Sequence, residues 1–267
     1  MVDKTKEENK INIFKKLFNK FLDEVYPEKL TCANCQEEVL LENRFLCDKC
    51  NRGLIKIDYS CLKCGDKIFK PNNYCDYCKN KNWYFDKAIS CFEYSGVAKS
   101  LIYKLKYNNK KFIAKILAKP LADKFLNSGF DKIDIVTCVP TTTKRLKQRG
   151  YNQAEALATE FCNIINKNEK VLNKNFSLVK RVKDVSTQIN LTKEQRKQNL
   201  LNAFEFAGNK EFVKGKNILI IDDVFTTGAT VEELSKVFKI NKANKVYVLT
   251  VCHTCLQGKQ INKQGKK

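Results

Sequence analysis

The stretch ILIIDDVFTTGAT, residues 218–230, joins a buried-type strand to a polar exit and decides the expected fold. Its first four residues are all apolar, which is typical of a central strand in a parallel sheet. Two adjacent acids, Asp222 and Asp223, follow at the predicted end of this strand. Because ligands of parallel α/β sheets bind beyond the carboxyl ends of the strands, we expect a binding site at this point.

The loop after the acids has the composition of a phosphate site. Gly228 lets the backbone approach a ligand closely, and a helix predicted to begin near Thr230 would direct its N–H groups at an anion. The two carboxylates before it are acceptors suited to a diol, such as two ribose hydroxyls. An ordinary capped turn would explain Thr230 but not the paired acids, and a Walker-type loop is excluded because its lysine is absent. The candidate phosphate loop comprises Thr226, Thr227, Gly228, Ala229 and Thr230.

Strand-like and helical patterns alternate around this stretch. Apolar runs of strand type lie at 88–94, 133–139, 176–179, 218–221 and 246–251, and helical patterns lie at 97–107, 112–125, 153–165 and 230–238. Such alternation predicts a mostly parallel, Rossmann-like sheet with helices on both faces. We therefore expect an α/β domain over residues 83–267.

Eight of the thirteen cysteines form four CxxC pairs, separated by gaps of 11, 10 and 10 residues. Two such pairs complete a tetrahedral thiolate set, so sequential pairing predicts two zinc sites, while a crossed pairing stays open. Because four thiolates leave no position for a substrate, we expect structural zinc, with an iron–sulfur cluster as the alternative. The pattern predicts a double zinc ribbon over residues 29–82, with the ligand sets Cys32, Cys35, Cys47, Cys50 and Cys61, Cys64, Cys75, Cys78.

A further CxxC pair lies near the C-terminus, in the sequence CHTC at 252–255. A lone pair is weak support for metal binding, so a third ion held by Cys252, His253 and Cys255 is the less favoured interpretation. The remaining cysteines, Cys91, Cys138 and Cys162, lie in apolar segments and are predicted to be core residues.

Residues 1–28 carry an amphipathic helical pattern. Ile11, Phe14, Phe18, Phe21 and Val25 recur at spacings of three and four, and Pro27 would end the helix. The simplest expectation is a helix packed on its own protein. A helix that binds a membrane surface or a partner is the alternative.

The formal net charge of +21 favours polyanionic partners, although a general preference for lysine would also raise it. Residues 99–150 concentrate this charge, with thirteen Lys and Arg against three Asp and Glu. Basic residues interleaved with aromatic ones can follow a single nucleic-acid strand by charge and stacking, whereas an amphipathic helix with a solvated face is the competing interpretation. The candidate basic residues are Lys104, Lys106, Lys110 and Lys111.

The sequence contains no apolar run long enough to cross a membrane, and its N-terminus has no apolar signal core. We therefore expect a cytoplasmic protein with reduced thiols, with the membrane periphery as an alternative location.

Two parts of the sequence resemble known protein families. Residues 218–230 resemble the phosphoribosyl-pyrophosphate (PRPP) motif of type I phosphoribosyltransferases, with an apolar tetrad, an acid pair and a TTG-type loop. Residues 30 to 251 as a whole resemble the ComF competence family, in which a double zinc ribbon precedes a phosphoribosyltransferase domain. The other matching stretches are YSGVAKSLIYKLKY (94–107), VPTTTKRLKQRGYNQAEALA (139–158) and the series Arg181, Thr187, Gln188, Leu191, Arg196, Asn199 and Phe204.

The resemblance implies a role for each part of the site. Asp222 and Asp223 hold the ribose 2′ and 3′ hydroxyls of PRPP as the catalytic pair, and loop 226–230 holds its 5′-phosphate. Mg²⁺ accompanies the pyrophosphate, and residues 183–196 form a mobile lid. The pyrophosphate itself faces the residues that match the family's loop, which are Pro140, Thr141, Lys144 and Arg145.

The resemblance also implies a part in the uptake of single-stranded DNA during natural transformation, with a competence helicase as a partner. The expected chemistry is pentosyl transfer from PRPP, but the sequence identifies no acceptor and leaves turnover open. The alternatives are a phosphoribosyltransferase of nucleotide salvage and a catalytically silent adaptor that binds single-stranded DNA or docks a helicase.

Overall fold

The computed structural model describes residues 31–39, 45–71, 73–107, 110–167, 172–183 and 202–255. The chain divides into two compact units, Met1–Arg52 and Gly53–Lys267. The predicted helix in residues 1–28 lies outside the described residues. Within the described part, no helix is both long and apolar enough to cross a membrane.

The first unit contains the first cysteine tetrad. Its described residues include one antiparallel bridge, Thr31 with Glu38, and the short helix α2, Asp48–Arg52. The second tetrad belongs to the second unit, so the two halves of the predicted ribbon fall into different compact units. The division into a ribbon at residues 29–82 and an α/β domain at residues 83–267 stays a prediction.

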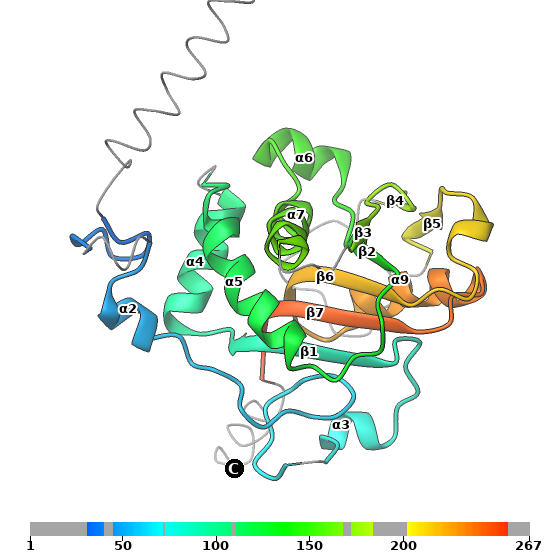
Figure 1. The fold of residues 1–267 in the computed structure, drawn as a ribbon, viewed down its shortest axis with the longest axis horizontal. Coiled ribbons are helices and arrows are strands. Elements are labelled where there is room, and N and C mark those ends of the chain that lie inside the picture. The colour runs from blue at the N-terminus through cyan, green and yellow to red at the C-terminus, as the bar shows by residue number, and fades with distance from the viewer. Residues whose placement is uncertain are drawn as a thin grey trace, which may run out of the picture. The chain divides into compact units, whose positions relative to one another are not determined.

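The second unit is built on a five-stranded parallel sheet in the order β1-β7-β6-β2-β3 (Figure 1). The prediction of an α/β fold with a parallel sheet is thereby confirmed. The bounds of the strands are Lys87–Glu93 for β1, Val246–His253 for β7, Ile218–Phe225 for β6, Ile135–Cys138 for β2 and Asn173–Lys174 for β3.

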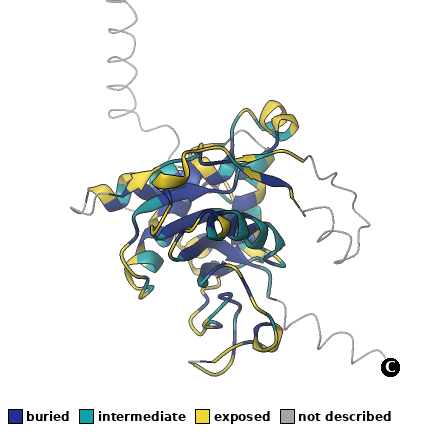
Figure 2. Cartoon of the chain, turned by 90° about the vertical axis from the view of Figure 1, so that its right-hand side faces the viewer, coloured by how far each residue is buried: buried dark blue, intermediate teal, exposed yellow. Residues whose placement is uncertain are grey.

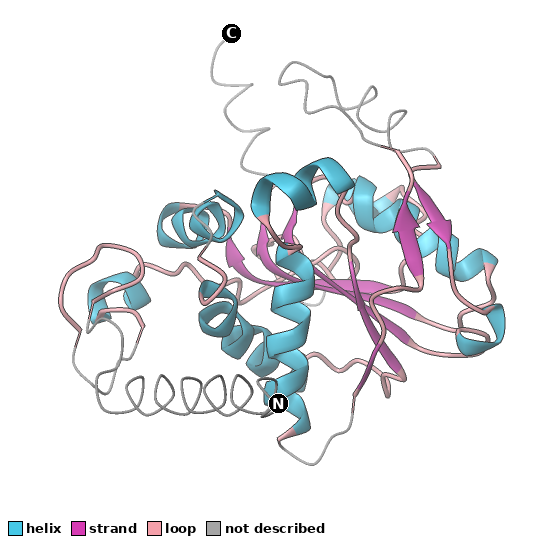
Figure 3. Cartoon of the chain, turned by 90° about the horizontal axis from the view of Figure 1, so that it is seen from above, coloured by secondary structure: helices cyan, strands magenta, loops and turns pink. Residues whose placement is uncertain are grey.

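Helices cover both faces of this sheet (Figure 3). α5 and α7 pack against each other and on one face, while α9 packs on the opposite face with the alternate residues of β6 and β7. The sheet between them is the buried centre of the unit (Figure 2), and every residue of β7 is buried. The helices are α4 (Gly96–Tyr107), α5 (Ile113–Leu126), α6 (Thr143–Arg149), α7 (Gln153–Asn166) and α9 (Ala229–Ile240).

The predicted strand at 176–179 is wrong as a member of this sheet. The chain instead forms β4, Val179–Arg181, which pairs antiparallel with β5, Phe204–Phe206, in a separate two-stranded ribbon. Leu178 and Val179 are buried in the cluster that α9 covers, so their apolar character serves that cluster and not a sixth place in the sheet. A short apolar run cannot distinguish these two environments.

The second cysteine tetrad is packed into the core of the α/β unit. Its four cysteines share one buried cluster with side chains of β6, β7 and α9. The turn at residues 61–65 (the knuckle) also contacts β1 directly. The N–H of Ala88 donates to the carbonyl of Lys63 at 2.7 Å, and a Cβ on Gly65 would lie 2.8 Å from the carbonyl oxygen of Ala88. The short helix α3, Asp76–Lys79, is labelled in Figure 1. It contributes Cys78 to the same cluster.

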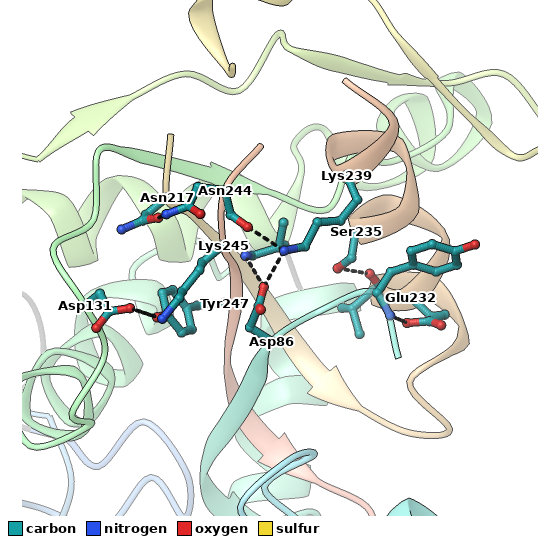
Figure 4. A network of polar contacts seen from close by, with 12 residues as sticks. Asp86, Asp131, Asn217, Glu232, Ser235, Lys239, Asn244, Lys245 and Tyr247 are labelled. Atoms are coloured by element: carbon teal, nitrogen blue, oxygen red, sulfur yellow. Dashed lines mark hydrogen bonds and ion pairs between the residues drawn. The ribbon is translucent and has the colours of Figure 1, made fainter. Parts of the chain in front are cut away.

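A polar network fastens the amino ends of the strands (Figure 4). The Oδ2 atom of Asp86 accepts from the N–H of Val246, and the ammonium of Lys239 lies 2.8 Å from the same oxygen. The Nζ of Lys239 also donates to the carbonyl of Asn244 at 2.6 Å. These contacts connect the start of β1, the start of β7 and the last turn of α9 at the end of the sheet opposite to Asp222.

Candidate functional site

The acid pair lies beyond the end of a neighbouring strand. β6 continues to Phe225 because β7 pairs with it as far as His253, so the strand is longer than the predicted 218–221. On its other side β2 ends at Cys138, which pairs with Ile221. Strand alternation directs the carboxylates of Asp222 and Asp223 to opposite sides of β6, next to the edge that β2 leaves.

Asp223 has one charged partner and one unpartnered oxygen. Its Oδ1 lies 2.8 Å from the ammonium of Lys106, which comes from the last turn of α4. Asp223 is only 4% exposed, and its Oδ2 has no hydrogen-bond partner among the described residues. A buried acceptor without a donor costs about 1–3 kcal/mol, so this oxygen marks a place where a ligand hydroxyl would fit.

Asp222 titrates near neutrality. Burial and the adjacent Asp223 carboxylate raise the pKa of Asp222 to about 7, although the N–H of Asp223 donates to its Oδ1 at 2.8 Å. Lys106 and Arg181 act in the opposite direction. Burial alone would lower the pKa of Lys106, but the charge and hydrogen bond of Asp223 together with the charge of Asp222 outweigh burial, and the pKa of Lys106 lies above its ordinary value.

The predicted phosphate loop directly follows β6 and leads into α9. Gly228 has a φ of 76° and precedes the first residue of the helix. A Cβ at this position would lie 2.6 Å from Cζ of Phe225 and 2.8 Å from the ring of Trp83. Ala229 donates its N–H to Oγ1 of Thr227 at 3.4 Å. The loop therefore requires glycine for both its conformation and its space.

Aromatic and polar contacts hold this loop from two sides. Trp83 packs on Phe85 and Phe225 with ring centroids 4.7 and 6.4 Å apart. On the other side the ring of His253 stacks on Phe225 at 4.8 Å, and Thr254 donates its N–H to the Phe225 carbonyl at 3.0 Å. The backbone that would receive a phosphate is thus fixed before any ligand binds.

The predicted pyrophosphate loop lies at the same edge of the sheet as the acid pair. The N–H of Val139 donates to the carbonyl of Ile221 at 3.1 Å, which joins the start of this loop to β6. Lys144 is exposed and Arg145 half-buried on α6, a helix that the sequence interpretation did not include. Thr142 caps α6 by accepting from the N–H of Arg145. The half-buried residues before the helix are Pro140 and Thr141.

The cap could have revealed α6 in advance. Thr142 is a strong N-cap residue, and Gly150, with a φ of 75°, ends the helix in the left-handed conformation that glycine favours. Both signals are visible in the sequence TTTKRLKQRG.

The four candidate nucleic-acid lysines do not share one environment. Lys106 faces Asp223, as its position four residues after the buried Ile102 could have indicated. Lys111 is exposed and Lys110 partly so, near Phe112, which is 44% exposed. Lys104, also partly exposed, lies on α4 between Tyr103 and Tyr107, whose rings are 4.9 Å apart and more than half exposed.

Both cysteine tetrads have the geometry of a four-thiolate metal site. In each set the sulfur atoms all lie within 4.8 Å of one another, and the sets follow the sequential pairing. The pairs Cys35–Cys47 and Cys64–Cys75 have their sulfurs 3.6 Å apart, close to the spacing of about 3.8 Å around tetrahedral zinc. Each set could therefore bind one zinc ion.

The CHTC segment does not form a third such group in the described part of the chain. Cys252 and His253 are buried in β7, and Nδ1 of His253 lies 3.3 Å from Oδ1 of Asp66. Burial lowers the pKa of His253 to about 4, so the ring is neutral at neutral pH. The predicted lid at 183–196 lies outside the described residues except for Lys183.

Two enzymes are among the solved structures whose fold matches part of this chain. The glutamine PRPP amidotransferase of B. subtilis matches with a TM-score of 0.34 and 18% identity over 51% of this chain and 25% of its own. A hypoxanthine-guanine-xanthine phosphoribosyltransferase matches with a TM-score of 0.31 and 16% identity over 54% of this chain and 63% of its own.

Sequence relatives cover far more of the chain, although no family model matches it. It is 29% identical to Competence protein F of Haemophilus influenzae over 78% of this chain and 90% of that protein. It is 28% identical to the DNA utilization protein YhgH of Salmonella typhimurium, over 84% and 96%, and 21% identical to Competence protein ComFC of Bacillus subtilis, over 76% and 75%. The chain is therefore a homologue of the ComF and YhgH proteins over most of its length.

Proposed function

We propose that this chain binds Mg–PRPP at the carboxyl edge of its sheet and supports the uptake of single-stranded DNA. The observation that carries the first part is the buried Oδ2 of Asp223, an acceptor without a donor, placed just before a glycine loop at a helix N-terminus. The names of its relatives, competence and DNA utilization proteins, support the second part.

In this proposal, different residues of the site bind the ribose, the 5′-phosphate and the pyrophosphate of PRPP. A ribose lying across the edge of β6 beyond Cys138 reaches the carboxylates of Asp222 and Asp223, which accept its two hydroxyls. The N–H groups of the loop at Gly228 receive the 5′-phosphate. Lys144 and Arg145 attract the pyrophosphate, and Mg²⁺ bound with it supplies further neutralisation of the leaving group.

Binding of Mg–PRPP should raise the melting temperature, and the acid pair should be required for this shift. A ligand at one hundred times its Kd stabilises by about 2.7 kcal/mol, which corresponds to about 5 °C or more for a domain of this size. The double variant Asp222→Asn with Asp223→Asn should show no shift in a thermal melt with Mg–PRPP. Asp131→Asn, an exposed change at the amino end of the sheet, should keep it. Absence of a shift in the wild-type protein would refute PRPP binding.

A second role, binding of single-stranded DNA by the surface around α4, is favoured by the exposed aromatic rings of Tyr103, Tyr107 and Phe112. Rings of this kind stack on bases in a sequence-tolerant way, and neighbouring lysines attract the backbone. A helicase partner and a place at the membrane periphery belong to the same proposal.

Replacing the three other candidate lysines should weaken the binding of single-stranded DNA and reduce its dependence on salt. With Lys104, Lys110 and Lys111 all changed to Gln, the slope of log affinity against log salt should fall by about 2, because each phosphate contact contributes about 0.7. Fluorescence anisotropy with a labelled oligonucleotide measures both quantities. The control removes equal charge from exposed lysines elsewhere, Lys132, Lys210 and Lys216, and should change little. Equal losses in both variants would exclude the α4 surface as the specific contact.

A further inference from the structure

One charged side chain of the basic region, Lys106, is turned toward β6 and not toward the exposed surface around α4. Lys106 belongs to the buried side of α4, and its side chain is 20% exposed. Its neighbours Tyr103 and Tyr107 lie on the exposed side of the same helix. Since a lysine loses favourable hydration when it is buried, this orientation indicates a specific partner.

The partner is the acid pair. The ammonium of Lys106 lies 2.8 Å from Oδ1 of Asp223 and also attracts Asp222. This contact occupies only one oxygen of Asp223, and the other is buried without a donor among the described residues. A carboxylate used purely for an internal ion pair would leave no such buried acceptor, so the second oxygen points to a ligand hydroxyl.

The charges of the site explain why an ammonium is needed there. Two carboxylates on consecutive residues repel each other, and here Asp223 is buried and Asp222 half-buried. The proposed ligand is itself strongly anionic, so an acid pair without a counter-ion would repel it. One buried ammonium offsets a full negative charge at a distance where solvent screens little.

We propose that Lys106 is a positioning residue of the PRPP site, whose ammonium holds Oδ1 of Asp223 so that the carboxylate is turned with Oδ2 free to accept a ribose hydroxyl. The inference rests on the proposed function. It assigns Lys106 to ligand binding and removes it from the set of lysines that contact nucleic acid.

The pH dependence of binding follows from the groups around the acid pair. Lys106 and Tyr94 face it from the side of α4, Arg181 from β4, Cys138 from β2 and Cys252 from β7. Burial raises the pKa of Tyr94 and of both thiols, so all three stay neutral between pH 6 and 8. Asp222, with a pKa of about 7, is therefore the group that changes charge, and affinity for Mg–PRPP should increase as pH rises through this value.

The test compares three variants by titration calorimetry with Mg–PRPP at several pH values between about 6 and 9. Lys106→Met should weaken binding about tenfold or more at pH 7, because it leaves a buried carboxylate unpaired. The midpoint of its pH profile should move upward, so that part of the affinity returns at high pH. Lys106→Arg should bind nearly as the wild type does. Lys99→Met removes the same charge from an exposed site on the same helix and should have no effect.

The outcomes separate this inference from the proposed function. A wild-type protein that fails to bind Mg–PRPP overturns both. Wild-type binding with an unchanged affinity and pH profile in Lys106→Met overturns the role of Lys106 alone. Lys106→Gln, which keeps a donor but not the charge, replaces Lys106→Met if that variant fails to fold. Affinity for single-stranded DNA should be unchanged in the folded Lys106 variants, and a selective loss of DNA binding in Lys106→Met would return Lys106 to the nucleic-acid surface.

Discussion

Replacing Gly228 by alanine is expected to abolish PRPP binding and to lower the free energy of unfolding by about 2–4 kcal/mol. The backbone at this residue has a φ of 76°, which an L side chain adopts only with strain. The added Cβ would also lie 2.6 Å from Phe225 and 2.8 Å from Trp83, so the loop or both rings must move. Either movement changes the N–H groups that would receive the phosphate.

A second glycine separates strain from crowding. Gly215 has a φ of 68°, but no atom lies within 4 Å of the place its Cβ would take. Gly215→Ala should therefore cost only about 1 kcal/mol and leave ligand binding intact. Urea unfolding measures the stabilities, and the fluorescence of Trp83, the single tryptophan, reports directly on the loop. Equal costs for the two substitutions would contradict the crowding at Gly228.

Loss of the second tetrad is expected to unfold the α/β unit, whereas loss of the first should leave that unit folded. Cys64 is fully buried in the cluster that contains β6, β7 and α9. Its knuckle packs on β1, and the chain continues from the tetrad to Trp83, which contacts the phosphate loop. Because a structural zinc contributes about 10 kcal/mol or more to folding, a domain of ordinary stability cannot lose it and remain folded.

The matched pair is Cys64→Ser and Cys35→Ser, one ligand from each tetrad. Cys35 is exposed and belongs to the first compact unit. Each variant should lose one of two zinc ions by metal analysis. Only Cys64→Ser should lose the near-ultraviolet dichroism of Trp83 and the Mg–PRPP shift. If Cys35→Ser caused the same collapse, the two tetrads would form one cooperative unit and the division after Arg52 would have no thermodynamic meaning.

Local patterns were sufficient for much of this fold. The all-apolar run of β6 predicted a central parallel strand, and four of the predicted helices occur with ends that differ from the prediction by at most two residues. The CxxC spacings predicted both tetrads and their sequential pairing. These features depend on residues close together in the chain, where periodicity and ligand spacing carry the information.

Contacts between distant residues required the tertiary structure. The sequence alone placed Lys106 among the basic residues of a surface, because its charge is visible there but its partner Asp223 lies on another element. It also treated the eight ribbon cysteines as one module, since spacing says nothing about which core receives each knuckle. The run at 176–179 was assigned to the wrong sheet for the same reason. Composition and spacing thus identify the acid pair, the glycine loop and the two cysteine tetrads, while long-range packing selects which charge faces which carboxylate, because burial and ion pairing depend on neighbours in space and not in sequence.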